Sequence, residues 1–195
     1  MTDETNPGGG PPDIGELERT GAGAVVRFRR RLSHPPDKVW RALSESDHLA
    51  AWFPTTIDGD REAGAALQFR FRQSEGPAMD GEMVVFDPPR LMELQWGDER
   101  LRFELQPDAE GTVLVFSAAF AEIGKSARDG AGWHACLDLL DCTLDGRRPR
   151  WTSAQRWGQV RHLYIDRFGP EASAIGPPEQ WKKVHGSEAS STGSN

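Results

Sequence analysis

One segment, residues 130–146 (GAGWHACLDLLDCTLDG), constrains the fold of this chain more than any other. It has the length and spacing of a single helix, but it carries more apolar residues than a helix on a protein surface. At about 100° per residue, one narrow stripe contains Trp133, Leu137, Leu140 and Leu144. A second apolar group, well away from that stripe, consists of Ala135, Leu139 and Cys142. The apolar arc is about twice the roughly 100° of an ordinary surface helix, so we expect a sheet on one side and another element on the other.

The chain supplies a candidate for that second element. Residues 153–169 (SAQRWGQVRHLYIDRFG) have helical spacing, with Ser153 as the predicted N-cap and Gly169-Pro170 as the predicted end. The apolar face of this segment consists of Trp157, Val160, Tyr164 and Phe168. We expect this helix to pack near Leu139 and Cys142, and a dimer contact at the same place is the alternative.

The polar residues of the long helix lie on a third side, which we expect to face water: His134, Asp138, Asp141 and Asp145. His134 and Asp138 are four residues apart and would then form a hydrogen-bonded pair on the surface. Residues 147–168 contain six arginines and a single acidic residue, Asp166. We favour a solvated helix face that pairs with the aspartates of the long helix over a docking site for an acidic partner or nucleic acid.

The remaining chain predicts strands and two short helices. Residues 24–32 alternate apolar and polar side chains like a half-buried strand, and short helices follow at 37–43 and 46–53, with Ser46 as an N-cap and Pro54 as the end. Further alternating segments, separated by Gly, Pro and Asp turn signals, lie at 67–72, 79–86, 91–96, 101–105 and 112–120. Successive strands with short loops indicate an antiparallel meander, and the predicted fold class is α+β.

Composition bounds the domain organisation. A chain of 195 residues accommodates one domain, predicted at 24–146, and a C-terminal helical extension at 147–170. Residues 1–23 are rich in Gly and Pro and are expected to be disordered, and residues 171–195 are expected to form a flexible tail.

Charge and cysteine content narrow the function classes. A net charge of −7 argues against general binding to nucleic acid, which rewards surplus Lys and Arg. The sequence contains no apolar run that fits a signal peptide or a membrane span. Cys136 and Cys142 are too far apart on a helix for a disulfide, so we expect two free thiols and a cytoplasmic location.

Short motifs in a fixed order carry a family resemblance. They are Val39-Trp40-Arg41-Ala42-Leu43, His48-Leu49-Ala50-Ala51-Trp52-Phe53, Gly81-Glu82-Met83, Asp87-Pro88-Pro89-Arg90-Leu91, Trp96, and Gly132-Trp133 with Leu137 and Leu140. Over residues 24–146 the chain resembles the SRPBCC (START/Bet v-like) superfamily, specifically its AHSA-type branch, the domains similar to the activator of heat-shock-protein-90 ATPase. The resemblance implies a helix-grip fold, in which a curved antiparallel sheet wraps a long C-terminal helix with a cavity between them. Members bind lipids, sterols, polyketides or other apolar molecules, some are cyclases or aromatase-like enzymes, and one branch contacts the chaperone.

Large apolar side chains of the sheet and the long helix are the candidate lining of that cavity. They are Trp52, Phe53, Phe69, Phe71, Met83, Val85, Trp96, Phe103, Phe116, Trp133, Leu137 and Leu140. The alternative is that they fill the space completely. Glu82, Glu93 and Gln95 are candidate polar anchors if they point inward, although we favour an outward orientation. A bulge near Gly81 would decide which of Glu82 and Met83 points inward.

No spacing of Cys and His indicates a metal site, no glycine-rich phosphate loop indicates a nucleotide, and no cofactor is predicted. The preferred function is binding of a small apolar molecule, such as a lipid or polyketide, in a cavity between sheet and helix. An enzyme of the cyclase or hydrolase type in the same cavity ranks second, and a module that binds a chaperone partner ranks third. A homodimer is compatible with all three.

Overall fold

The computed structural model describes residues 13–72 and 76–177. Eight antiparallel strands form one sheet in the order β1-β2-β8-β7-β6-β5-β4-β3. The strands are β1 (Glu16–Thr20), β2 (Gly23–Leu32), β3 (Thr55–Asp58), β4 (Ala66–Phe71), β5 (Met79–Asp87), β6 (Leu91–Trp96), β7 (Glu99–Asp108) and β8 (Gly111–Phe120). The helices are α1 (Pro36–Ser44), α2 (Ser46–Leu49), η1 (Ile123–Lys125), α3 (Ser126–Leu144), α4 (Ser153–Phe168) and η2 (Glu171–Ser173).

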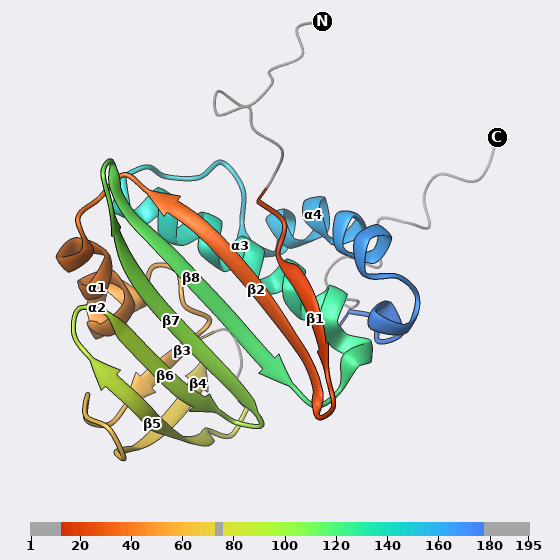
Figure 1. The fold of residues 1–195 in the computed structure, drawn as a ribbon, viewed down its shortest axis with the longest axis horizontal. Helices are drawn as coiled ribbons and strands as arrows, with labels where there is room; N and C mark the ends of the chain where they lie inside the picture. Colours follow the sequence, from red (N-terminus) through yellow and green to blue (C-terminus); the bar gives the residue numbers. More distant parts are fainter. Residues whose placement is uncertain (1–12, 73–75, 178–195) are drawn as a thin grey trace, which may run out of the picture.

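The helices cover one face of the sheet (Figure 1). Helix α3 crosses behind β2 and β8, α4 lies beside α3, and α1 and α2 lie at the other end of the molecule from α4. The four residues of the predicted stripe, from Trp133 to Leu144, are buried, as are Val26 and Phe28 of β2. The α+β helix-grip fold is therefore confirmed: the period-2 strands and the apolar stripe of α3 bury their side chains against each other.

Part of the side of α3 that we expected to face water, at His134 and Asp138, is instead covered by α4, whereas Asp141 and Asp145 stay partly exposed. His134 is 1% exposed, and its Nδ1 lies 2.9 Å from the hydroxyl of Tyr164 on α4. The guanidinium of Arg156 donates to Asp138 at 2.6 Å. Gly130 permits the close approach, because a Cβ there would lie only 3.0 Å from the Tyr164 ring. The prediction that this helix packs on α3 within one chain is therefore correct. These α3–α4 contacts, however, are made by His134 and Asp138 rather than near Leu139 and Cys142.

The N-terminal segment also differs from the expectation of a tail. Within residues 1–23, the described part includes β1, which pairs with β2 along its whole length from Glu16 opposite Arg27 to Thr20 opposite Gly23. The strand is mostly exposed, so its stability comes from backbone hydrogen bonds, and an exposed edge strand has no strong apolar signature in sequence. Residues 1–12 and 178–195 of the predicted tails lie outside the described residues.

Two predicted helix caps were wrong by one residue. The cap of α2 is Glu45 rather than Ser46, and this helix ends at Leu49, earlier than predicted. The cap of α4 is Thr152 rather than Ser153. Thr152 and Gln155 form a capping box, in which each side chain satisfies the backbone N–H of the other.

Candidate functional site

Aromatic rings fill most of the space between the sheet and α3. Trp133 contacts Phe53 and Phe116, with ring centroids 5.7 Å and 4.9 Å apart, and Phe103 contacts both Phe116 and Trp52. Several residues predicted to line a cavity are therefore core residues with almost no exposure: Trp52, Phe53, Phe69, Met83, Phe103, Phe116, Leu137 and Leu140. The large internal cavity is replaced by packed side chains.

An open cleft of about 420 Å³ remains at one edge of this core. Its lining comes from the strand side and from the two long helices: Pro54, Phe71, Met79, Trp96, Asp98, Glu99, Arg128, Asp129, Gly132, Trp133, Cys136 and Trp157. We call this space the α3 cleft. Of the predicted lining residues, Phe71, Trp96 and Trp133 border it.

The walls of the α3 cleft are aromatic. Trp96 lies between Phe71 and Trp133, with centroid distances of 5.7 Å and 5.6 Å and interplanar angles of 68° and 65°. The indole N–H of Trp96 donates to Thr55 Oγ1 at 3.3 Å, which fixes the ring. Phe71 is 42% exposed and is the only exposed large hydrophobic residue within 13–72 and 76–177. Phe71 thereby extends the apolar lining of the cleft to its solvent-exposed rim.

Helix α4 contributes to the same cleft through Trp157. The indole N–H of Trp157 donates to the backbone oxygen of Arg128 at 2.9 Å, so this ring is held against α3. The extension beyond the predicted domain therefore forms part of the cleft wall.

A buried ion pair lies at the polar end of the α3 cleft. Glu99 is 6% exposed, and the Lys125 ammonium donates to Glu99 Oε1 at 2.5 Å. The second carboxylate oxygen, Oε2, is buried and has no hydrogen-bond partner among the described residues. Burial raises the pKa of Glu99, and the hydrogen bond from Lys125 only partly opposes this. Burial lowers the pKa of Lys125, but the hydrogen bond and charge of Glu99 outweigh it and raise that pKa overall.

A second ion pair adjoins the first. Arg128 donates twice to Asp129, at 2.6 Å and 3.1 Å, and Lys125 lies 3.8 Å from the same carboxylate. Asp98, next to Glu99 in the turn between β6 and β7, is exposed on the cleft. Glu99 was not predicted as a site residue, because its position at the start of β7 carries no motif and Lys125 is distant in the chain.

The cysteine on the cleft is not an activated nucleophile. Burial raises the pKa of the Cys136 thiol to about 12, so the reactive thiolate is scarce at neutral pH.

Among the described residues, no three His, Cys, Asp or Glu side chains gather in a way that could hold a metal ion.

The predicted polar anchors lie away from the cleft. In β5 the pairing register shifts between Met83 and Val85. Met83 points inward and is fully buried, whereas Val85 pairs with Glu93. Glu93 pairs at 2.9 Å with Arg100 and Arg102. Glu82 is exposed, and the Gln95 amide donates to backbone oxygens of the turn at Gly97 and of Glu99. Val85 was predicted to line a cavity, but the bulge turns it to the other side of the sheet.

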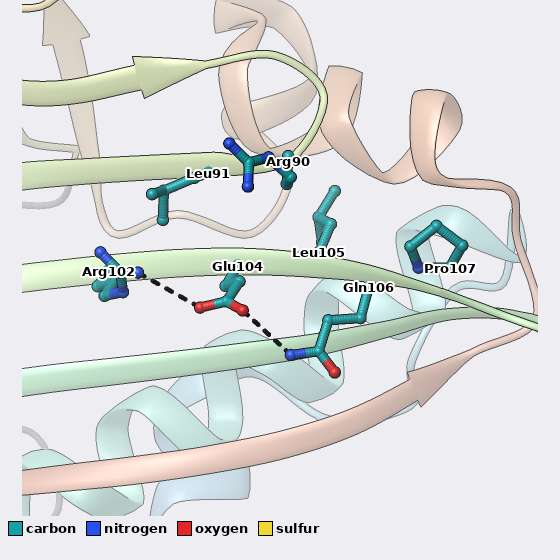
Figure 2. A pocket seen from close by; sticks show the side chains of 7 residues that line it. All are labelled: Arg90, Leu91, Arg102, Glu104, Leu105, Gln106 and Pro107. Carbon is teal, nitrogen blue, oxygen red and sulfur yellow. Dashed lines mark hydrogen bonds and ion pairs between the residues drawn. The ribbon is translucent and has the colours of Figure 1, made fainter.

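A smaller hollow of about 250 Å³ lies on the sheet across β6 and β7, bordered by Arg90, Leu91, Arg102, Glu104, Leu105, Gln106 and Pro107. Figure 2 shows three of its polar side chains, Arg102, Glu104 and Gln106, bonded to one another. Arg102 and Gln106 both donate to Glu104, at 3.4 Å and 3.1 Å. Because these groups satisfy one another, the α3 cleft is the better candidate site.

Comparisons with known proteins agree with this architecture. The family model for the activator of Hsp90 ATPase homolog 1-like protein matches residues 33–145. No curated protein matches the chain. No described helix is long and apolar enough to cross a membrane.

Solved structures with this fold come from several bacteria. CalU16 from Micromonospora echinospora is 20% identical, with a TM-score of 0.62 over 79% of this chain and 98% of the other. A conserved protein of unknown function, EF2215 from Enterococcus faecalis, is also 20% identical, with a TM-score of 0.64 over 78% and 88%. The protein encoded by BPP1335 from Bordetella parapertussis is 25% identical, with a TM-score of 0.61 over 84% and 95%.

Proposed function

Because the chain belongs to the family of activator of Hsp90 ATPase homolog 1-like proteins, a ligand-binding type of domain, we propose that it binds a small apolar molecule in the α3 cleft. The observation that carries the proposal is the cleft itself, about 420 Å³ with Trp96, Trp133 and Trp157 in its walls. Ligand sites are typically apolar hollows of a few hundred Å³ with few polar groups, and Phe71 leaves part of this apolar surface open to solvent.

Native mass spectrometry of the protein purified from its source tests this function. We expect a small molecule to co-purify and to be lost in Gly132→Leu, because a side chain there enters the cleft and its Cβ meets only Trp157, at 4.0 Å. Gly176→Leu is the matched control, since a Cβ at Gly176 meets nothing within 4 Å. A molecule that stays bound in Gly132→Leu would contradict the proposed site, and a protein that retains no small molecule would contradict the function.

A cavity enzyme is the second candidate, and Glu99 is the observation in its favour. A buried carboxyl with a raised pKa beside an apolar cleft can act as a general acid. The high pKa of Cys136 argues against covalent catalysis by that thiol. The chaperone partner and the cytoplasmic location stay predictions from the sequence.

A further inference from the structure

The polar end of the α3 cleft carries more negative than positive charge. Three carboxylates line it, from Asp98, Glu99 and Asp129, against the single guanidinium of Arg128. Lys125 adds one positive charge beside Glu99 and Asp129. Both cations are already paired, Lys125 with Glu99 and Arg128 with Asp129. The local balance of three acids and two bases leaves a negative potential at this end, and low-dielectric walls strengthen it.

One exposed carboxylate, that of Asp98, can take a further partner, and the buried carboxylate of Glu99 is incompletely compensated. The Oε2 atom of buried Glu99 has no hydrogen-bond partner among the described residues. Asp98 is exposed on the cleft, and it takes part in no ion pair with the other described residues. A buried carboxylate oxygen without a donor is unfavourable, and a cation nearby favours the charged form of the carboxyl even without direct contact.

The aromatic walls favour the same kind of ligand. Phe71, Trp96 and Trp133 meet at steep interplanar angles, so that each successive pair forms a corner. Ring faces attract cations, and tryptophan is the strongest of the three aromatic residues. Trp157 already has the Arg161 guanidinium 5.4 Å from its ring centroid, and Trp133 is only 5% exposed. The half-buried ring of Trp96 and the exposed ring of Phe71 are therefore the main faces for a ligand.

We infer that the α3 cleft selects apolar, aromatic molecules that carry a protonated amine. The ammonium lies at the end with Asp98 and Glu99, and the aromatic body packs against Phe71 and Trp96. This inference rests on the proposed function and names the chemical class of its ligand.

Three naphthalene probes of nearly equal size test the charge preference: 2-(aminomethyl)naphthalene as the cation, 2-(hydroxymethyl)naphthalene as the neutral donor, and 2-naphthoate as the anion. Calorimetric titration of the full chain at pH 7 and low salt gives the three dissociation constants. We expect the cation to bind about tenfold tighter than the anion, with the alcohol between them, because cation–π and carboxylate attraction act together. High salt should reduce this difference, since part of the cleft is exposed.

Two variants locate the source of the preference. Glu99→Gln should weaken binding of the cation and leave the alcohol nearly unchanged, whereas Glu104→Gln, in the hollow across β6 and β7, should change neither. If Glu99→Gln fails to fold because Lys125 loses its partner, Asp98→Asn tests the same prediction with an exposed residue, and we expect a two- to threefold loss for the cation alone, of the order of a surface charge pair.

The outcomes separate this inference from the proposed function. If all three probes bind equally, or if the anion binds tightest, the inference is overturned while a binding site for apolar molecules stands. A cation preference that survives both Glu99→Gln and Asp98→Asn would also overturn it. If no probe binds and the native protein retains no small molecule, the proposed function itself fails.

Discussion

Helix α3 is buried on two sides by different physical means. Toward the sheet, Trp133 packs against Phe53 and Phe116, and the leucines of the same stripe are buried: Leu137, Leu140 and Leu144. This contact is almost entirely apolar. Toward α4, His134 and Asp138 form a network with Tyr164 and Arg156. The apolar side gains stability in proportion to the area it buries, whereas the polar side is stable only while each buried group keeps its partner.

The polar contact extends beyond the two helices. Arg30 is a cationic residue on the inner face of β2, and its guanidinium lies 3.3 Å from Asp138. The Tyr164 hydroxyl accepts a hydrogen bond of 3.1 Å from the backbone N–H of Gly15, just before β1. One network thus joins α3, α4, β2 and the N-terminal segment, so that a local change should affect several elements at once.

The largest expected effect comes from the apolar side. Trp133→Ala should destabilise the fold by about 4 kcal/mol, because it removes a 5% exposed ring and leaves a cavity against Phe53 and Phe116. Urea unfolding monitored by circular dichroism measures the change. Leu139→Ala, at a half-buried position of the same helix, is the control and should lose much less. Equal losses in the two variants would contradict the packing described for this side.

A slightly smaller effect is expected on the polar side. Asp138→Ala should cost about 3 kcal/mol, because the buried His134 and the partly buried Arg30 and Arg156 lose a shared carboxylate. Asp141→Ala is the matched control and should cost only about 0.5 kcal/mol, since Asp141 pairs with an exposed Arg147. Thermal unfolding of both variants measures the two losses of stability, and we expect the loss in Asp138→Ala to be clearly larger. Similar small losses would mean that the network adds nothing beyond surface pairing.

The smallest effect is expected in mild acid. Burial raises the pKa of Asp138, but hydrogen bonds and charges from His134, Arg30 and Arg156 outweigh it and bring the pKa below the ordinary 3.8. This group therefore contributes stability above pH 3.8, which is lost as the pH falls through the lower folded-state value. The difference in unfolding free energy between the wild type and Asp138→Asn should narrow below pH 3.8, as measured by urea unfolding from pH 7 to pH 3. A constant difference would show that Asp138 does not carry this acid dependence.

The two sides of α3 were also unequally predictable. Trp133, Leu137 and Leu140 were placed correctly because large apolar residues at helical spacing have one stable environment, the core. His134 and Asp138 were expected to face water, because polar residues usually do. Their burial depends on Tyr164, Arg156 and Arg30, which are contributed by other elements, and no pattern within the helix encodes that.

The candidate site shows the same division. Trp96 and Trp133 were named from sequence, and both border the α3 cleft. Glu99 was not named, since a glutamate at the start of a strand usually faces solvent. Its pairing with Lys125 brings together two residues 26 positions apart. Val85 was misplaced because a one-residue register shift in β5 reverses the alternation.

The sequence by itself determined the order of the elements other than β1, β3 and the two short η helices, the α+β architecture and the stripe of α3 that packs on the sheet. These features depend on residue periodicity along a short stretch of chain. Only the tertiary structure decided that aromatic rings fill most of the expected cavity, that α4 covers His134 and Asp138 of α3, and that an open cleft ends at Glu99. Those features depend on how side chains from distant segments share volume and charge, and pairwise distances of that kind exist only once the chain has folded.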